Sequence, residues 1–172
     1  MKSALERMNS MSNILTNDLK SQYAKAFATV RGILDTFPDD KWMEPHGDVY
    51  YIPSRIAYHL TEFIDGVVGG GYKDPEFRNN LQFGPWHTGT PETLPSRAAL
   101  ISYFEEVISR ANKELESVDD AYLASAMPEE LARMGAARIS AHILAMREIS
   151  AHTGELNKML IENGLDDVWV SR

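Results

Sequence analysis

Apolar residues recur every three or four positions along four long segments of this 172-residue chain, and no segment keeps the alternating pattern of a strand. The segments are 12–37, 53 to the glycine triplet at 69–71, 97–118 and 129–163. Each is long enough to form an amphipathic helix that buries one face. The sequence therefore predicts an all-α protein folded as a four-helix bundle.

Local signals mark the ends of these segments. Ser96 is a helix N-cap residue type, placed directly before the third segment, and Gly164 follows the fourth as a C-terminal stop. The stretch 73–95 is rich in Pro, Gly, Asn and Thr, so we expect a long loop there. Loops of this length in a compact domain are often functional or covering elements.

Length and charge limit the class of protein. A chain of 172 residues fits a single domain, 1–172, and its net charge of −8 without clustered Lys or Arg argues against nucleic acid as a partner. No segment approaches the roughly 20 apolar residues needed to span a membrane, and no signal-like leader is visible, so we expect a cytoplasmic protein. The absence of cysteine excludes a Cys nucleophile and a Cys-based zinc site.

Three residues form a candidate metal site. Glu148 and His152 are four positions apart in the fourth segment, which places them about 40° apart on one helical face. His59 lies on the apolar side of the second segment. Two histidines and one carboxylate from two helices supply three ligands for a zinc-like ion and leave one position open for chemistry.

The same residues have simpler interpretations. A Glu and a His four apart often form only an exposed side-chain pair, and a His on an apolar face is usually a hydrogen-bonded core residue. His142 lies about 80° from His152 on the helical wheel and is expected in the core or behind the ligands. Loop residues His46 and His87 are weaker candidates, because nothing in the sequence fixes their direction.

Known helical metal sites differ from this pattern. Di-iron carboxylate bundles need two Glu-x-x-His pairs, and zincins need His-Glu-x-x-His, neither of which occurs here. The chain does contain Ile-Ala-Tyr-His-Leu-Thr-Glu at 56–62 and Met-Arg-Glu-Ile-Ser-Ala-His-Thr-Gly at 146–154. On these residues the whole chain resembles the DinB/YfiT-like superfamily of four-helix-bundle metalloproteins. Most members carry His where this chain has Glu148, so its pattern is most similar to the mycothiol-dependent maleylpyruvate isomerase branch.

The resemblance implies a site and a function. It assigns a divalent metal ion, zinc or nickel, to His59, Glu148 and His152. It further implies a transferase or isomerase that uses a low-molecular-weight thiol bound at the open metal position, acts on a small-molecule substrate, and forms a homodimer.

Two other functions remain open at this stage. The same ion can activate water for hydrolysis, with Glu62 or Glu155 handling the proton. Alternatively, the protein is a non-catalytic bundle whose metal is structural or absent. No substrate-binding arginine stands out, although Arg55, Arg138 and Arg147 are candidates in the sequence.

Overall fold

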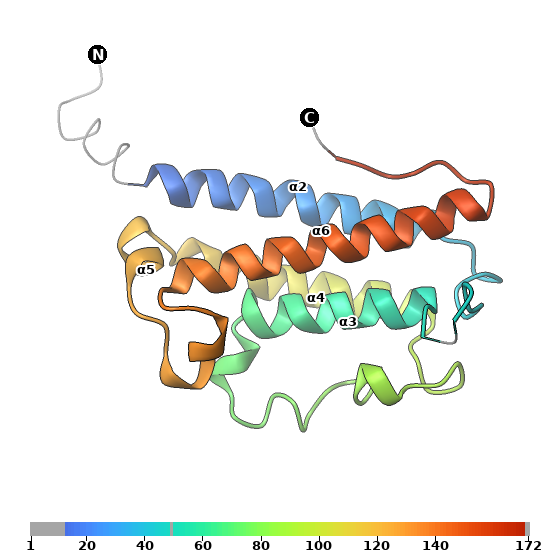
Figure 1. Ribbon diagram of the computed structural model, residues 1–172, viewed down its shortest axis with the longest axis horizontal. Helices are drawn as coiled ribbons and strands as arrows, with labels where there is room; N and C mark the ends of the chain where they lie inside the picture. The colour runs from blue at the N-terminus through green and yellow to red at the C-terminus, as the bar shows by residue number, and fades with distance from the viewer. Residues whose placement is uncertain (1–12, 49, 171–172) are drawn as a thin grey trace, which may run out of the picture.

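The computed structural model describes residues 13–48 and 50–170, and their regular structure is helical (Figure 1). Four long α-helices dominate: α2 (Ile14–Thr36), α3 (Pro53–Val67), α4 (Arg97–Glu116) and α6 (Arg138–Glu162). A short α5 (Asp120–Ala124) and the 3-10 turns η1 (Gly71–Lys73), η2 (Trp86–Thr88) and η3 (Glu129–Met134) lie in the connections. The prediction of an all-α protein is confirmed. Within the described ranges, no helix is long and apolar enough to cross a bilayer.

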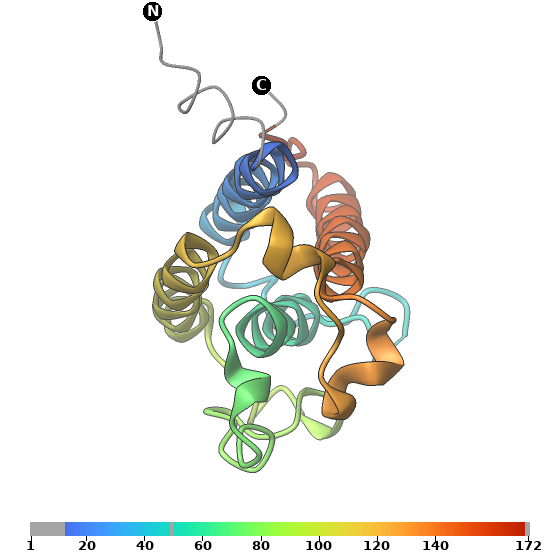
Figure 2. The same ribbon diagram turned by 90° about the vertical axis from the view of Figure 1, so that its left-hand side faces the viewer.

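The four long helices pack side by side around one core (Figure 2). Helices α2 and α6 run in one direction, and α3 and α4 run in the other (Figure 1). Because α3 and α4 are parallel, the connection between them must return along the length of the bundle. This requirement explains the long loop that the sequence predicts at 73–95.

The core draws on all four helices. Helix α3 contacts α4 and α6, and α2 also contacts both of them. Each helix contributes apolar side chains with no exposed surface, such as Val30, Leu60, Leu100 and Leu156. Burying one such side chain contributes roughly 1.5–3 kcal/mol. The apolar periodicity of the sequence therefore marks the faces that meet in the core.

Several helix ends follow the local signals. The Ser96 side chain accepts a hydrogen bond from the Ala99 backbone N–H at 3.3 Å and caps α4 as predicted. Beyond α6, Gly164 adopts a positive φ of 76°, and the Leu165 N–H donates to the Leu160 carbonyl at 3.0 Å. A glycine in this left-handed conformation ends a helix at little steric cost. The predicted start of the first helix at Ser12 lies outside the described residues.

Helix α6 begins nine residues later than the sequence predicts. The predicted start at Glu129 falls on η3, which ends before Gly135 at a φ of 140°. The chain then pairs with the preceding segment, because the Arg138 N–H donates to the Ser125 carbonyl at 3.0 Å. The helix-forming composition of 129–134 was therefore misleading: the glycine and this backbone pairing separate η3 from α6.

The sequence analysis missed the short helix α5, although Asp119 is a preferred N-cap residue type. The Asp119 side chain caps this helix by accepting from the Tyr122 N–H at 2.6 Å. The neighbouring Asp120 carboxylate accepts from the N–H and the hydroxyl of Thr16, at 2.8 and 2.6 Å. Because these bonds reach 104 positions back to the start of α2, they tie the α4–α6 connection to the bundle.

An ion pair between a buried carboxylate and a partly exposed guanidinium joins α3 to α4. Asp65, only 5% exposed, accepts two hydrogen bonds from the Arg110 guanidinium at 2.9 and 3.0 Å. Its carboxylate also accepts from the Tyr103 hydroxyl at 2.8 Å. Three hydrogen bonds offset the desolvation of this carboxylate and hold the two parallel helices in register.

Candidate metal centre

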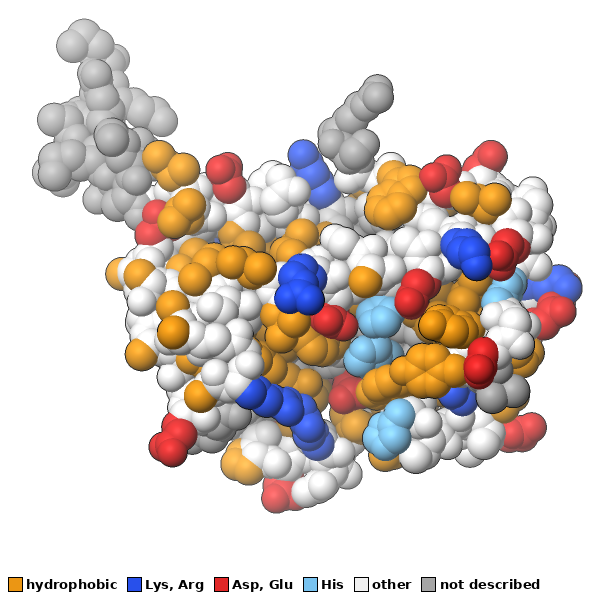
Figure 3. All heavy atoms as spheres, in the orientation of Figure 1, with side chains coloured by type: hydrophobic (Ala, Val, Ile, Leu, Met, Phe, Trp, Pro, Cys, Tyr) orange, Lys and Arg blue, Asp and Glu red, His pale blue; other side chains and the backbone are white. Residues whose placement is uncertain are grey.

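The three predicted ligands converge between two packed helices. His59 comes from α3, and Glu148 and His152 come from consecutive turns of α6. One ligating atom from each lies within 4.8 Å of the other two. Histidine side chains gather on this face of the molecule (Figure 3). The structure therefore brings His59 next to two residues that follow it by 89 and 93 positions in the sequence.

The geometry fits a metal ion. In a tetrahedral site, metal–ligand bonds of about 2.0–2.2 Å place the ligand atoms roughly 3.3–3.6 Å apart. The ligand atoms of the triad lie within 4.8 Å of one another, so side-chain rotations that move them by about 1 Å would bring them to these separations. All three side chains are partly buried, so their donor atoms are shielded without being inaccessible. The His59, Glu148 and His152 group can thus hold a metal ion, and its two imidazoles and one carboxylate suit zinc and nickel alike.

His152 is held between two carboxylates on its own helix. Its Nε2 lies 3.5 Å from Glu148 Oε2, on the side of the triad. Its Nδ1 lies 2.8 Å from Glu155 Oε2. A metal-binding histidine commonly donates its second ring N–H to a carboxylate, which fixes the tautomer and the ring direction. Glu155 occupies that position relative to His152.

His59 is packed among aromatic rings. The Trp86 ring of η2 covers it at 4.0 Å between centroids and 35° between planes. The His152 ring also contacts His59, edge-on, with 4.9 Å between the ring centroids and 81° between the planes. Burial, and then the neighbouring His152, lower the pKa of His59 to about 4. The imidazole is therefore neutral near pH 7, which is the form that binds metal.

A cavity of about 340 Å³ opens beside His59. Two guanidinium groups, Arg78 and Arg133, line it together with the Trp86 ring. Glu62 also lines it, one helical turn after His59, and its Oε2 is buried without a hydrogen-bond partner among the described residues. Burial raises the pKa of Glu62, although Arg78 opposes the shift. The cavity thus combines the buried Glu62 carboxyl group with two guanidinium cations next to His59.

The remaining histidines described are not members of the triad. His142 is only 7% exposed, and its Nδ1 lies 3.1 Å from the Tyr23 hydroxyl. It is the core histidine that the helical wheel predicted. His46 Nδ1 lies 3.2 Å from Glu162 Oε2 near the end of α6. His87 is exposed on η2 and lines the cavity beside His59.

The three arginines proposed from the sequence occupy different places. Arg55 is buried and donates to the Gly89 carbonyl at 2.5 Å, which anchors the 73–95 loop to α3. Arg147 is exposed on α6. Arg138 lines a second cavity. The arginines that share a cavity with His59 are Arg78 and Arg133, both of which the sequence analysis missed.

Two further contacts of the site were also missed. The three-residue spacing of His152 and Glu155 was readable as a same-face helical pair, but the sequence analysis considered Glu155 only as a proton carrier. The contact between Trp86 and His59 joins a loop to a helix, so no local spacing could reveal it.

The comparisons with known proteins add no assignment. No model of a known protein family matches the chain, and no curated protein matches it either.

Proposed function

We propose that this protein is a DinB-like, metal-dependent transferase or isomerase that uses a low-molecular-weight thiol at an open metal position. One observation carries the proposal. The ligand atoms of His59, Glu148 and His152 converge within 4.8 Å, and one of the three, His59, also lines a cavity large enough for a small molecule. These are the three positions at which the resemblance expects metal ligands. A homodimer is part of the same proposal and rests on the resemblance.

The donor set decides the chemistry that a bound ion supplies. Two neutral imidazoles and one carboxylate leave a divalent ion with a formal charge near +1, which lowers the pKa of a coordinated thiol or water. The chain contains no cysteine. A sulfur nucleophile must therefore come from a separate thiol molecule.

The surrounding residues serve binding and shielding. Arg78 and Arg133 supply positive charge for an anionic substrate or thiol in the cavity. The Trp86 ring excludes water from one face of His59. Glu155 orients His152 through its Nδ1. None of these roles requires a large movement of the bundle.

Cobalt substitution tests the proposal directly. Titration of the cobalt-loaded protein with 2-mercaptoethanol or cysteine should produce a sulfur-to-metal charge-transfer band in the near ultraviolet. Ethylene glycol and serine are the matched controls, because each replaces the thiol by a hydroxyl, and neither should produce the band. If no tested thiol changes the cobalt spectrum, the thiol-dependent function is wrong and hydrolysis or a non-catalytic role takes its place.

Metal-dependent hydrolysis is the second candidate, and Glu62 favours it. Its carboxylate is buried beside His59 with one oxygen unpartnered, and its pKa is raised by burial. A raised pKa makes a carboxylate a better proton acceptor. On this hypothesis Glu62→Gln abolishes turnover of an ester substrate while metal content is unchanged. A thiol-dependent reaction without a requirement for Glu62 contradicts it.

A further inference from the structure

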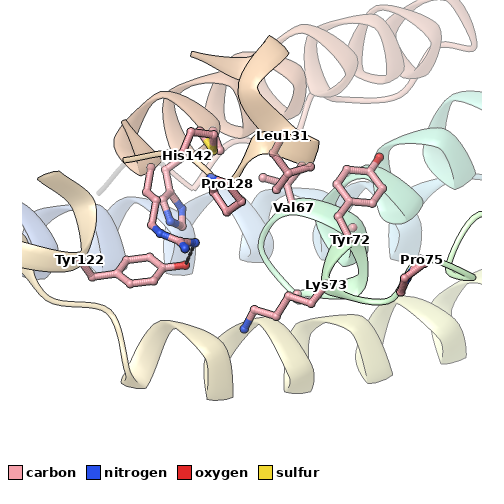
Figure 4. A pocket seen from close by; sticks show the side chains of 13 residues that line it. Val67, Tyr72, Lys73, Pro75, Tyr122, Pro128, Leu131 and His142 are labelled. Carbon is pink, nitrogen blue, oxygen red and sulfur yellow. Dashed lines mark hydrogen bonds between the residues drawn. The ribbon is translucent and has the colours of Figure 1, made fainter. Parts of the chain in front are cut away.

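A second cavity, of about 380 Å³, lies near the start of α6 (Figure 4). Its wall comes from the end of α3, from η1, from α5 and η3, and from the first turns of α6. His59, Glu148 and His152 are not among the residues that line it. Arg138, which does line it, precedes Glu148 by ten residues, or about 15 Å along the helix axis. The cavity is therefore separate from the candidate metal centre.

The charge of this cavity is opposite to that of the whole protein. Arg138 and Lys73 line it, and no Asp or Glu does, although the chain carries a net charge of −8. Lys73 is paired with Glu114. Arg138 is in a different state: among the described residues, no carboxylate lies within ion-pair distance of its guanidinium. An arginine in an acid-free cavity is a binding group for an anion.

Tyr122 holds the Arg138 guanidinium in place. The guanidinium donates to the Tyr122 hydroxyl at 3.1 Å and lies 4.7 Å from the centre of the same ring. Figure 4 shows the Tyr122 side chain at one end of the cavity, near His142. This single neutral contact fixes the direction of the guanidinium and leaves most of its five N–H donors for a ligand.

A buried imidazole supplies a second polar group. His142 lines the cavity although 93% of its surface is buried, and Tyr23 occupies its Nδ1. Its Nε2 is thus the ring atom left for a ligand. The imidazole adds directional hydrogen bonding and no charge near pH 7, because burial lowers the pKa of His142 to about 4.

The rest of the wall is apolar and includes Val67, Met127, Pro128 and Leu131. We propose that this cavity is a second ligand site for a small carboxylate with an apolar body, in which Arg138 binds the carboxylate and His142 donates or accepts one hydrogen bond. The apolar body lies against Val67 and Leu131. This volume and this ratio of apolar to polar lining are typical of small-molecule sites. The proposal is independent of the proposed enzymatic function.

The two cavities share one residue. The Tyr72 side chain lines both, and its ring lies where a Cβ on Gly66 would come within 2.6 Å. Glycine at position 66 therefore lets the Tyr72 ring pack directly on α3. A ligand in the second cavity therefore contacts Tyr72, whose side chain also lines the cavity beside His59.

Phenylacetate is a suitable probe, with phenylacetamide and phenethylamine as neutral and cationic controls. We expect phenylacetate to bind the full-length protein with and without metal, and both controls to bind at least about tenfold more weakly. Amide chemical-shift changes in an NMR titration should cluster in η1, η3 and the start of α6.

Arg138→Met removes the charge and keeps the length of the side chain, and we expect it to weaken phenylacetate binding about tenfold or more. Arg147→Met is the matched control on the same helix, because Arg147 is exposed and outside the cavity; it should change the affinity less than about twofold. Tyr122→Phe, which removes only the hydroxyl that fixes Arg138, should weaken binding several-fold and guards against misfolding of the first variant. Absence of phenylacetate binding, equal loss in Arg138→Met and Arg147→Met, or shift changes centred on His59 would overturn the proposal.

Discussion

The carboxylate of Glu155 lies 2.8 Å from Nδ1 of His152, and Glu148 lies 3.5 Å from Nε2 of the same ring. The two contacts use opposite nitrogens of one imidazole. With Nδ1–H donated to Glu155, the Nε2 lone pair points toward Glu148 and the triad. Glu155 thus orients the His152 ring so that its Nε2 faces the triad.

Replacing Glu155 should weaken metal binding without removing a ligand. We expect Glu155→Gln to lower zinc affinity modestly, because an amide oxygen still accepts from Nδ1–H, and Glu155→Ala to lower it about 10- to 100-fold. Competition with a chromogenic chelator measures both constants. Glu162→Gln, a change in an exposed carboxylate of the same helix, is the control and should leave the affinity unchanged. Equal affinities for wild type and Glu155→Ala would remove the orienting role.

Acidification should destabilise the metal-free protein through His142. Its pKa is lowered to about 4 by burial, from an ordinary value of 6.5. The folded state therefore keeps this imidazole neutral at pH values where the unfolded chain binds a proton. The stability that the neutral His142 imidazole contributes is complete above about pH 6.5 and is lost as the pH falls toward 4. Over this range the free energy of unfolding falls by up to about 1.4 kcal/mol per pH unit.

His142→Asn isolates this effect, because Asn keeps hydrogen-bonding capacity and does not titrate. The difference in unfolding free energy between wild type and the variant, measured with urea at several pH values in the presence of a chelator, should shrink as the pH falls from 6.5 to 4. A difference that stays constant over this range would show that His142 is not buried in its neutral form.

The ion pair between α3 and α4 should contribute strongly to stability. Asp65→Ala leaves the Tyr103 hydroxyl and the Arg110 guanidinium without their shared acceptor. We expect a loss of about 2–4 kcal/mol in the free energy of unfolding, at the lower end because Arg110 is partly exposed. Arg31→Ala, which breaks an exposed pair with Asp35, should cost less than about 1 kcal/mol. Comparable losses in the two variants would contradict the structural role of Asp65.

The long helices were predictable because each buries one face. Leu60 and Leu156 belong to apolar stripes with helical spacing, and neither side chain has exposed surface. What the sequence could not supply depends on contacts between distant segments. Helix α5 is tied by Asp120 to Thr16, and α6 starts late because the Arg138 N–H pairs with Ser125. Neither hydrogen bond can be predicted from the local composition of the sequence.

The candidate site was predictable to the same extent. The spacing of Glu148 and His152 placed them on one helical face, and the position of His59 on the apolar side of the second predicted helix made it the third candidate ligand. The residues around the triad came from elsewhere: Trp86 reaches His59 from the loop between α3 and α4, and Arg133 reaches the same cavity from η3. The position of Trp86 depends on the path of the α3–α4 loop, and the position of Arg133 depends on the break between η3 and α6. Both features are visible only in the folded chain.

The most direct test of the central claim is the metal content of the purified protein, measured by elemental analysis on folded wild type and on three single variants. The wild type should bind one equivalent of zinc or nickel per chain, and His59→Ala and His152→Ala should each bind less than about a tenth of that amount. His142→Ala, which removes a buried histidine of the same bundle outside the triad, should retain a full equivalent despite its lower stability. Equal metal loss in all three variants, or a wild type that binds no divalent ion, would contradict the assignment of His59, Glu148 and His152 as a metal centre.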